Sequence, residues 1–217
     1  MIVNLNLQNK KVVVVGAGKE ALKRINSLKD QNCQITVIGD KISNEVTNLE
    51  KMKKIKIEKQ KVSNLDFLSK ERPDMVISTT NDKNLNKKII KKAKRKKIIT
   101  YSSDNPEESD FSNPAVINYK EIIQIAIFTG GKSPIMSKKL KNSIERALPK
   151  IISKQDIVQI KVQQIARKLA KSEIEDQVKR KKFLSNIMSD EAIKQLIKDN
   201  QTKKVEKYII TTLKDWK

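Results

Sequence analysis

The stretch Lys11-Val-Val-Val-Val-Gly-Ala-Gly-Lys-Glu-Ala21 decides the fold of the first half of this chain. Four consecutive valines are typical of a strand that is buried on both faces of a parallel sheet. Two glycines end this run, and residues 20–29 then carry apolar side chains at helical spacing. A strand, a glycine turn and a helix in this order predict the start of a β-α-β unit.

The glycine turn also predicts a site for the pyrophosphate of a dinucleotide. In the pattern Gly-x-Gly-x-x-Ala, Gly16 permits the tight turn, and Gly18 lets the backbone approach phosphate oxygens. The first N–H groups of the following helix have no helical partners and face the same site. We therefore expect four residues of this turn to bind the cofactor: Gly16, Gly18, Lys19 and Glu20.

The alternation of β-branched runs with helical segments continues to about residue 101, which predicts a Rossmann-type α/β domain with a parallel sheet. The predicted strands are 11–15, 34–38, 55–59, 75–78 and 98–101. A long Lys-rich helix is predicted over 84–97.

Further candidate binding residues follow two of these strands, at the edge of the sheet where open α/β folds bind ligands. Asp40 is placed to accept hydrogen bonds from the adenosine ribose, which favours NAD, and an ordinary turn aspartate is the alternative. Lys41 beside it keeps NADP open. Thr79 and Thr80 can contact the cofactor, and their alternative role is to cap the next helix.

The pattern changes after a turn-rich loop that ends near residue 114. Two apolar runs of strand length, 115–118 and 122–128, precede a helix predicted over 135–148 and ended by Pro149. From residue 150 on, three or four amphipathic helical segments follow. The two strands have no obvious partner within so short a segment, so pairing across a two-fold axis, in a homodimer, would cover their edges.

The absence of histidine limits the chemistry of this chain. It excludes Ser-His-Asp triads and imidazole metal sites, and the single cysteine, Cys33, excludes a disulfide framework and C-x-x-C or C-x-x-H metal spacings. We assign no metal ligands. A general acid or base must therefore be Asp, Glu, Lys or Tyr.

A net charge of +22 raises nucleic acid as a partner. However, the excess is spread along the chain, lysines far outnumber arginines, and aromatic residues are only 4% of the sequence. Nucleic-acid readers favour arginine forks and stacked aromatics, so we expect an anionic small substrate instead. No apolar run has the length of a membrane span and the N-terminus lacks signal-peptide features, so we expect a cytoplasmic protein.

Six segments, in one register over residues 1–150, resemble the precorrin-2 dehydrogenase family, which occurs alone or fused in siroheme synthases. They are GAGKEALKR (16–24), TVIGD (36–40), ISTTND (77–82), SSDNPEESDFSNPA (102–115), IAIFTGGKSP (125–134) and IERALP (144–149). The resemblance implies NAD-dependent oxidation of precorrin-2, an anionic tetrapyrrole, to sirohydrochlorin. It also implies a Rossmann domain at 1–113, a small α/β dimerisation segment at 114–149, and a helical domain at 150–217 that closes over the substrate.

The family's acid–base aspartate matches Asp104. Capping of the turn at Asn105-Pro106 is the alternative role for this residue. The chain departs from the family at Tyr101, where relatives usually have the asparagine of Asn-x-Val-Asp, and at Phe128, where they tend to have a small hydroxyl residue. Two other functions stay open: a bifunctional enzyme that also inserts Fe²⁺, and a regulatory NAD-sensing module without turnover.

Overall fold

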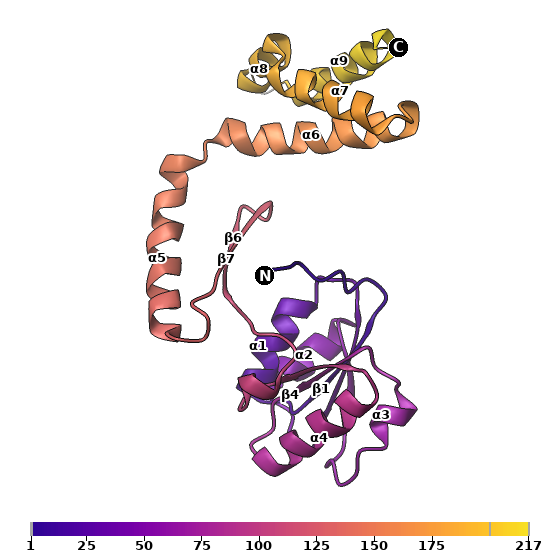
Figure 1. Cartoon of the computed structure of the whole chain (residues 1–217), viewed down its shortest axis with the longest axis vertical. Coiled ribbons are helices and arrows are strands. Elements are labelled where there is room, and N and C mark those ends of the chain that lie inside the picture. Colours follow the sequence, from indigo (N-terminus) through magenta and orange to yellow (C-terminus); the bar gives the residue numbers. More distant parts are fainter. Residues whose placement is uncertain (1, 200, 217) are drawn as a thin grey trace. The chain divides into compact units, whose positions relative to one another are not determined.

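The computed structural model describes residues 2–199 and 201–216. It divides the chain into two compact units, residues 1–113 and 114–217, which we describe separately. The first unit is built on a parallel sheet with the order β3-β2-β1-β4-β5 (Figure 1). Its strands are β1 (Lys11–Val15), β2 (Gln34–Gly39), β3 (Lys56–Lys59), β4 (Met75–Ser78) and β5 (Ile99–Ser102). The predicted α/β fold is confirmed, and the strand ends lie within one residue of prediction.

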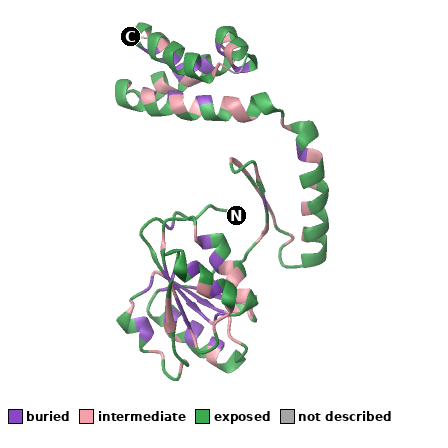
Figure 2. Ribbon diagram, turned by 180° about the vertical axis from the view of Figure 1, so that it is seen from behind, coloured by how far each residue is buried: buried purple, intermediate pink, exposed green. Residues whose placement is uncertain are grey.

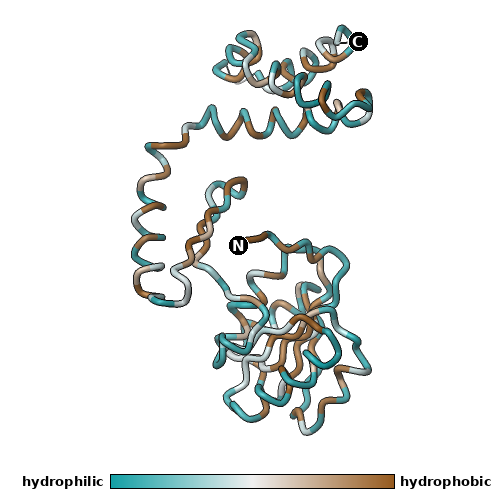
Figure 3. The backbone as a smooth tube through the Cα atoms, viewed as in Figure 1, coloured by the Kyte–Doolittle hydropathy of each residue, from teal (hydrophilic) through white to brown (hydrophobic). Residues whose placement is uncertain are grey.

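Helices cover both faces of this sheet. The helices on one face are α1 (Lys19–Leu28) and α2 (Asn44–Lys51), and those on the other are α3 (Phe67–Lys70) and α4 (Lys83–Arg95). Val12 and Val14 pack toward α1 and α2, whereas Val13 and Val15 pack toward α3 and α4. Strands β1, β2, β4 and β5 therefore hold most of the buried, apolar residues of the sheet, whereas the edge strand β3 has none that is fully buried (Figures 2 and 3). A strand between two cores explains why the run of valines does not alternate with polar residues.

Helices α2 and α3 were not predicted, although α2 carries a readable start signal. The Ser43 hydroxyl accepts a hydrogen bond from the Val46 N–H at 3.4 Å, as an N-terminal cap does. Val46 and Leu49 then form a short buried stripe. Helix α4 is capped by Asp82, which accepts from the Leu85 N–H, so Thr79 and Thr80 are not its cap.

The loop after β5 is fastened to that strand by Asp110. Its Oδ2 accepts hydrogen bonds from both the backbone N–H and the hydroxyl of Thr100, each at 2.8 Å, and Lys94 lies 3.2 Å from Oδ1. Burial acts to raise the pKa of the Asp110 carboxyl, but these hydrogen bonds and the Lys94 charge outweigh it and lower the pKa. Asp110 is thus a structural clasp for the loop.

In the second unit, β6 (Ala115–Tyr119) and β7 (Ile123–Ile127) pair with each other as an antiparallel ribbon. The prediction that these strands have no partner within the segment was therefore wrong. The turn hid the pairing, because Lys120 and Glu121 both take positive φ angles, of 54° and 59°. Hairpin turns need this geometry, but Asn and Gly are the residues that usually signal it.

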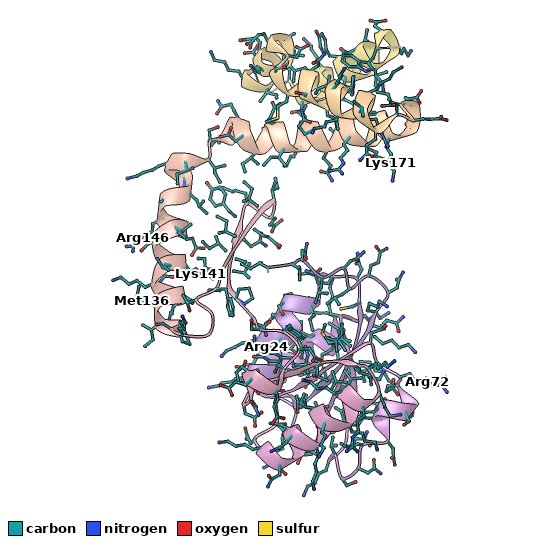
Figure 4. The ribbon with its side chains drawn as sticks, viewed as in Figure 1. Arg24, Arg72, Met136, Lys141, Arg146 and Lys171 are labelled. Carbon is teal, nitrogen blue, oxygen red and sulfur yellow. The ribbon has the colours of Figure 1, made fainter. Side chains whose placement is uncertain are left out.

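Helix α5 (Pro134–Ile151) contacts the β6–β7 ribbon and runs past its predicted end at Pro149. Proline removes one N–H from the helix, but the Ile152 N–H still donates to the Leu148 carbonyl at 2.8 Å. One missing bond in the last turn is therefore not enough to end the helix. Met136, Lys141 and Arg146 mark α5 in Figure 4, and Leu148 is its one fully buried residue among those described.

Four helices complete the chain, in agreement with the predicted three or four segments. They are α6 (Lys154–Glu173), α7 (Gln177–Ser189), α8 (Glu191–Lys198) and α9 (Thr202–Asp215). They share a separate apolar core in which Trp216 packs edge-on against Phe183, with ring centres 5.4 Å apart. Within residues 2–199 and 201–216, none of the helices combines the length and apolarity that a membrane crossing requires.

The clasp at Asp110 gives a stability prediction. We expect Asp110→Asn to lower the free energy of unfolding by about 1 kcal/mol near neutral pH, because hydrogen bonds to a carboxylate are stronger than those to an amide. The carboxylate is 38% exposed, so solvent screens the Lys94 pair and little of the loss comes from it. Urea unfolding measures the difference, with exposed Glu107→Gln as the control.

The sign of the pH dependence follows from the lowered pKa. A carboxyl with a depressed folded-state pKa contributes stability that is complete above its unfolded value of about 3.9 and is lost as the pH falls through the folded value. The difference between wild type and Asp110→Asn should therefore be constant near neutral pH and shrink as the pH falls below about 4. A difference that is independent of pH would contradict the assignment of the clasp to the ionised carboxylate.

Candidate cofactor and acid–base site

A cleft of about 440 Å³ lies at the carboxyl edge of the sheet in the first unit. Its walls come from the glycine turn after β1, the end of β2, the loop after β3 and the end of β4. Six of the predicted cofactor-binding residues line it: Gly16, Gly18, Asp40, Lys41, Thr79 and Thr80. These six residues thus converge at one edge of the sheet, as the ends of parallel strands do.

Gly16 is required by the fold itself. Its φ angle is +105°, and a Cβ atom there would lie 2.7 Å from Thr79 Oγ1 and 2.9 Å from the Thr79 carbonyl oxygen. Thr79 is in turn fixed to β1, because its N–H and its hydroxyl both donate to the Val15 carbonyl, at 2.8 and 3.0 Å. The first glycine thus allows the ends of β1 and β4 to meet.

Gly18 differs from Gly16, because a Cβ atom there would meet nothing within 4 Å. It caps α1 without a side-chain hydrogen bond, whereas Ser43 and Asp82 cap α2 and α4. The open space and the uncapped N–H groups of the first turn fit the pyrophosphate of a dinucleotide.

Lys19 and Glu20 do not line the cleft. The Glu20 carboxylate pairs with Lys23 at 3.0 Å and with Arg24. Burial acts to raise the pKa of Glu20, but the bonds and charges of these two cations outweigh it and lower the pKa. A role for Lys19 and Glu20 in cofactor binding stays a prediction, and their backbone N–H groups are the atoms suited to it.

Asp40 follows β2 directly and stands in the cleft with Lys41. Its Oδ1 accepts a hydrogen bond from the Lys41 N–H at 2.8 Å, which orients the carboxylate. The position agrees with that of a ribose-binding carboxylate, and this role also stays a prediction.

Asn86, on α4, is a fully buried residue that the sequence analysis missed. Its Oδ1 accepts from the hydroxyls of Ser78 and Thr80, both at 2.6 Å. Its Nδ2 donates to the Thr80 carbonyl at 2.9 Å and to Asp104 Oδ1 at 3.0 Å. The readable signal was a polar residue on the apolar stripe of α4, in line with Ile89, Ile90 and Ala93.

Asp104 lies in the loop after β5, as predicted, two residues beyond the end of the strand at Ser102. Its Oδ1 accepts from Asn86 and from the Ser102 hydroxyl, at 3.0 and 2.6 Å. The alternative role as a turn cap belongs to its neighbour, since Asn105 Oδ1 accepts from the Glu108 N–H at the start of the short 3₁₀ helix η1 (Pro106–Glu108). Asp104 does not line the cleft, but Thr80 does. Asn86 is hydrogen-bonded to both residues and so connects Asp104 to the cleft.

The two departures from the family have different surroundings. Tyr101 is buried, with its ring centre 5.3 Å from that of Phe111 and 4.8 Å from the Arg24 guanidinium carbon. Its side chain therefore belongs to the core next to α1. Phe128 follows β7 and is 49% exposed.

The two glycines give contrasting predictions. We expect Gly18→Val to lower NADH affinity about 100-fold while leaving the melting temperature almost unchanged, because the new side chain fills only the space proposed for phosphate. Gly16→Ala should instead lower the melting temperature, because the added atom strikes Thr79. Calorimetric titration and thermal unfolding measure the two effects. Unchanged NADH affinity in a folded Gly18→Val would contradict the assignment of this turn.

Comparison with known proteins agrees with this geometry. The siroheme synthase of Buchnera aphidicola subsp. Acyrthosiphon pisum is 30% identical over 149 residues, which are 67% of this chain and 30% of that protein. The siroheme synthase of Blochmanniella pennsylvanica is 28% identical over 209 residues, 94% of this chain and 41% of that protein. This chain thus spans less than half the length of these relatives.

A solved structure titled SirC, precorrin-2 dehydrogenase, superimposes with a TM-score of 0.70 over 96% of this chain and all of that one, at 23% identity. That likeness supports the fold over both units. Residues 3–115 match a family model described as "Putative NAD(P)-binding". This match covers the five-stranded sheet, the cleft and the clasped loop, and the chain therefore belongs to this NAD(P)-binding family.

Proposed function

We propose that the chain is an NAD-dependent dehydrogenase that oxidises precorrin-2 to sirohydrochlorin. The observation that carries the proposal is the anchored position of Asp104, an exposed carboxylate joined by hydrogen bonds to the cofactor cleft. The names of the matched proteins, siroheme synthase and precorrin-2 dehydrogenase, supply the reaction that such an arrangement suits.

The glycine turn, the first turn of α1 and Asp40 would hold NAD⁺, and the bound cofactor supplies a hydride acceptor. The Asp40 carboxylate favours the unmodified ribose of NAD, since a 2′-phosphate would place negative charge beside it. Thr80 extends the same cleft toward Asn86 and Asp104. The cofactor residues and the acid–base candidate thus occupy one edge of the sheet.

The proposed reaction removes a hydride and a proton from the macrocycle, so the protein must accept that proton. Asp104 is suited to this step, because Oδ1 is held by two donors while Oδ2 accepts no hydrogen bond from the described part of the chain. A positioned carboxylate of this kind contributes about 10²–10⁴ to a rate. The lack of histidine leaves few competitors for the role.

The charge of the protein agrees with an anionic tetrapyrrole. A net charge of +22 raises the local concentration of a polycarboxylate and speeds its encounter with the protein. Lys41 and Lys61 lie at the cleft itself. We further infer that this NAD-dependent reaction takes place in the cytoplasm.

We also propose that the β6–β7 ribbon and α5 form a homodimer interface. An isolated two-stranded ribbon is marginally stable in water, and its outer edges remain unpaired within the described residues. Exposed apolar side chains on these elements are Val116, Ile135, Met136, Leu140 and Ile151, and Phe128 directly after β7 is exposed as well. A second copy of the same surface would bury these side chains and pair the edges.

The acid–base role gives the first test. We expect Asp104→Asn to lower sirohydrochlorin formation about 100-fold or more, because the amide keeps the shape of the side chain but accepts no proton. NADH affinity should stay nearly unchanged, since Asp104 does not line the cleft. Absorbance of sirohydrochlorin measures turnover, and Glu107→Gln in the same loop is the control. Near-normal turnover of Asp104→Asn would contradict the proposal.

The interface gives the second test. Sedimentation of the wild type at micromolar concentration should show a species of twice the 24.9 kDa chain mass. Ile135→Asp should dissociate it, because Ile135 is 81% exposed on α5 and would carry a charge into the interface. Val178→Asp, on α7 at 64% exposure, is the matched control and should remain dimeric. A monomeric wild type would refute the interface.

A further inference from the structure

The hydrogen-bonding capacity of the Asn86 side chain is completely used. Two hydroxyls donate to its carbonyl oxygen, and its amino group donates to a backbone carbonyl and to a carboxylate. The residue is fully buried, and each of its four bonds is 3.0 Å or shorter. A buried polar group that is satisfied on every side is rigid and is costly to disturb.

We propose that Asn86 is the positioning residue for Asp104 and that it sets the geometry between the acid–base carboxylate and the cofactor cleft. The inference rests on the proposed dehydrogenase function and extends it, because no part of the reaction as described above assigns a role to Asn86. Asn86 itself is buried beneath the cleft edge and acts through Asp104 and Thr80.

The orientation of the amide is determined by its partners. The Thr80 carbonyl oxygen can only accept a hydrogen bond, so the atom that faces it at 2.9 Å must be the amino group. The Ser78 and Thr80 hydroxyls on the opposite side then donate to the carbonyl oxygen. The second N–H of the amide consequently points at Asp104 Oδ1.

This arrangement makes the two oxygens of Asp104 different. Oδ1 receives hydrogen bonds from Asn86 and Ser102, whereas Oδ2 receives none from the residues described here. The carboxylate is held at one oxygen and free at the other. Oδ2 is therefore the atom that accepts the proton, and Asn86 fixes where that atom lies.

The same amide also holds the loop on the cofactor side. Both the hydroxyl and the carbonyl of Thr80 bond to Asn86, and Thr80 lines the cleft. One rigid side chain thus spans the end of β4 and the loop after β5. Errors of about 1 Å in the placement of reacting groups cost up to about 10²-fold in rate, so a single spacer between the two loops has a direct catalytic effect.

A purely structural role is the competing explanation, since Asn86 also anchors the first turn of α4. The variant Asn86→Asp distinguishes a positioning role from a purely structural one. It keeps the size of the side chain and the oxygen that accepts from Ser78 and Thr80, but it replaces the amino group that donates to Asp104 and to the Thr80 carbonyl with an acceptor. Thr100→Val is the matched control, because it removes an equally buried hydrogen bond to Asp110, the clasp of the same loop.

We expect Asn86→Asp to lower kcat for sirohydrochlorin formation about 10- to 100-fold. NADH affinity measured by titration should fall far less than kcat, because the glycine turn, α1 and Asp40 are untouched and the Thr80 hydroxyl keeps its acceptor at position 86. Thr100→Val should lower the melting temperature to a comparable extent and leave kcat near the wild-type value. Equal kcat values for the two folded variants would overturn the inference.

A double variant tests whether Asn86 acts through Asp104. In the double variant, with Asp104→Asn and Asn86→Asp, the amide stands at position 104 and the carboxylate at position 86. The hydrogen bond between the two side chains is thus restored with its direction reversed. The kcat of the double variant should be no lower than that of Asp104→Asn alone, because the proton acceptor is already missing. A further multiplicative loss of kcat would show that Asn86 does not act through Asp104.

The activity of the wild type distinguishes a failure of this inference from a failure of the proposed dehydrogenase function. If the wild type forms no sirohydrochlorin with NAD⁺, the proposed function fails and the inference fails with it. If the wild type is active and Asp104→Asn is not, the function stands, and the comparison of Asn86→Asp with Thr100→Val decides the inference alone.

Discussion

The contact between Gly16 and Thr79 is the constraint on which the site depends. The absence of a side chain at Gly16 allows the end of β1 to lie against the end of β4, and Thr79 is then bonded twice to the Val15 carbonyl. This contact sets where the chain turns into α1, and therefore where the uncapped N–H groups of that helix lie. It also places the neighbouring Thr80 in the lining of the cleft, where its hydroxyl bonds to Asn86.

Asp104 and Asp110 belong to one loop but have opposite surroundings. Asp110 directs Oδ2 to two donors of Thr100 and Oδ1 to Lys94, so both of its oxygens are occupied. Asp104 has one oxygen anchored and the other open. The firmly clasped aspartate holds the loop in place so that the second can present a free oxygen atom. Sequence alone does not distinguish the two carboxylates, because the difference lies in partners from β5 and α4.

The predictions from sequence succeeded where a structural feature is determined by a short stretch of consecutive residues. Buried strands follow from β-branched runs, and the convergence of Gly16, Asp40 and Thr79 follows from strand ends that share one edge. They failed where a residue's role depends on partners that are distant in the sequence, or where a turn lacks its usual residues. Asn86 reads as a polar interruption of a helix stripe until its partners from β4 and the loop after β5 are known. The turn at Lys120–Glu121 adopts positive φ without the residues that announce it.

Strand β1 pairs with β2 and β4 and packs into an apolar core on each face of the sheet. This position limits which insertions, deletions and substitutions the strand tolerates during evolution. Successive valines face opposite helical layers, so inserting or deleting one residue within 11–15 would turn the following β1 side chains toward the opposite core. It would also move Gly16 out of register with Thr79. Side-chain identity in β1 can therefore drift among β-branched residues, whereas its length cannot, and gaps in homologous sequences should fall in the connecting loops instead.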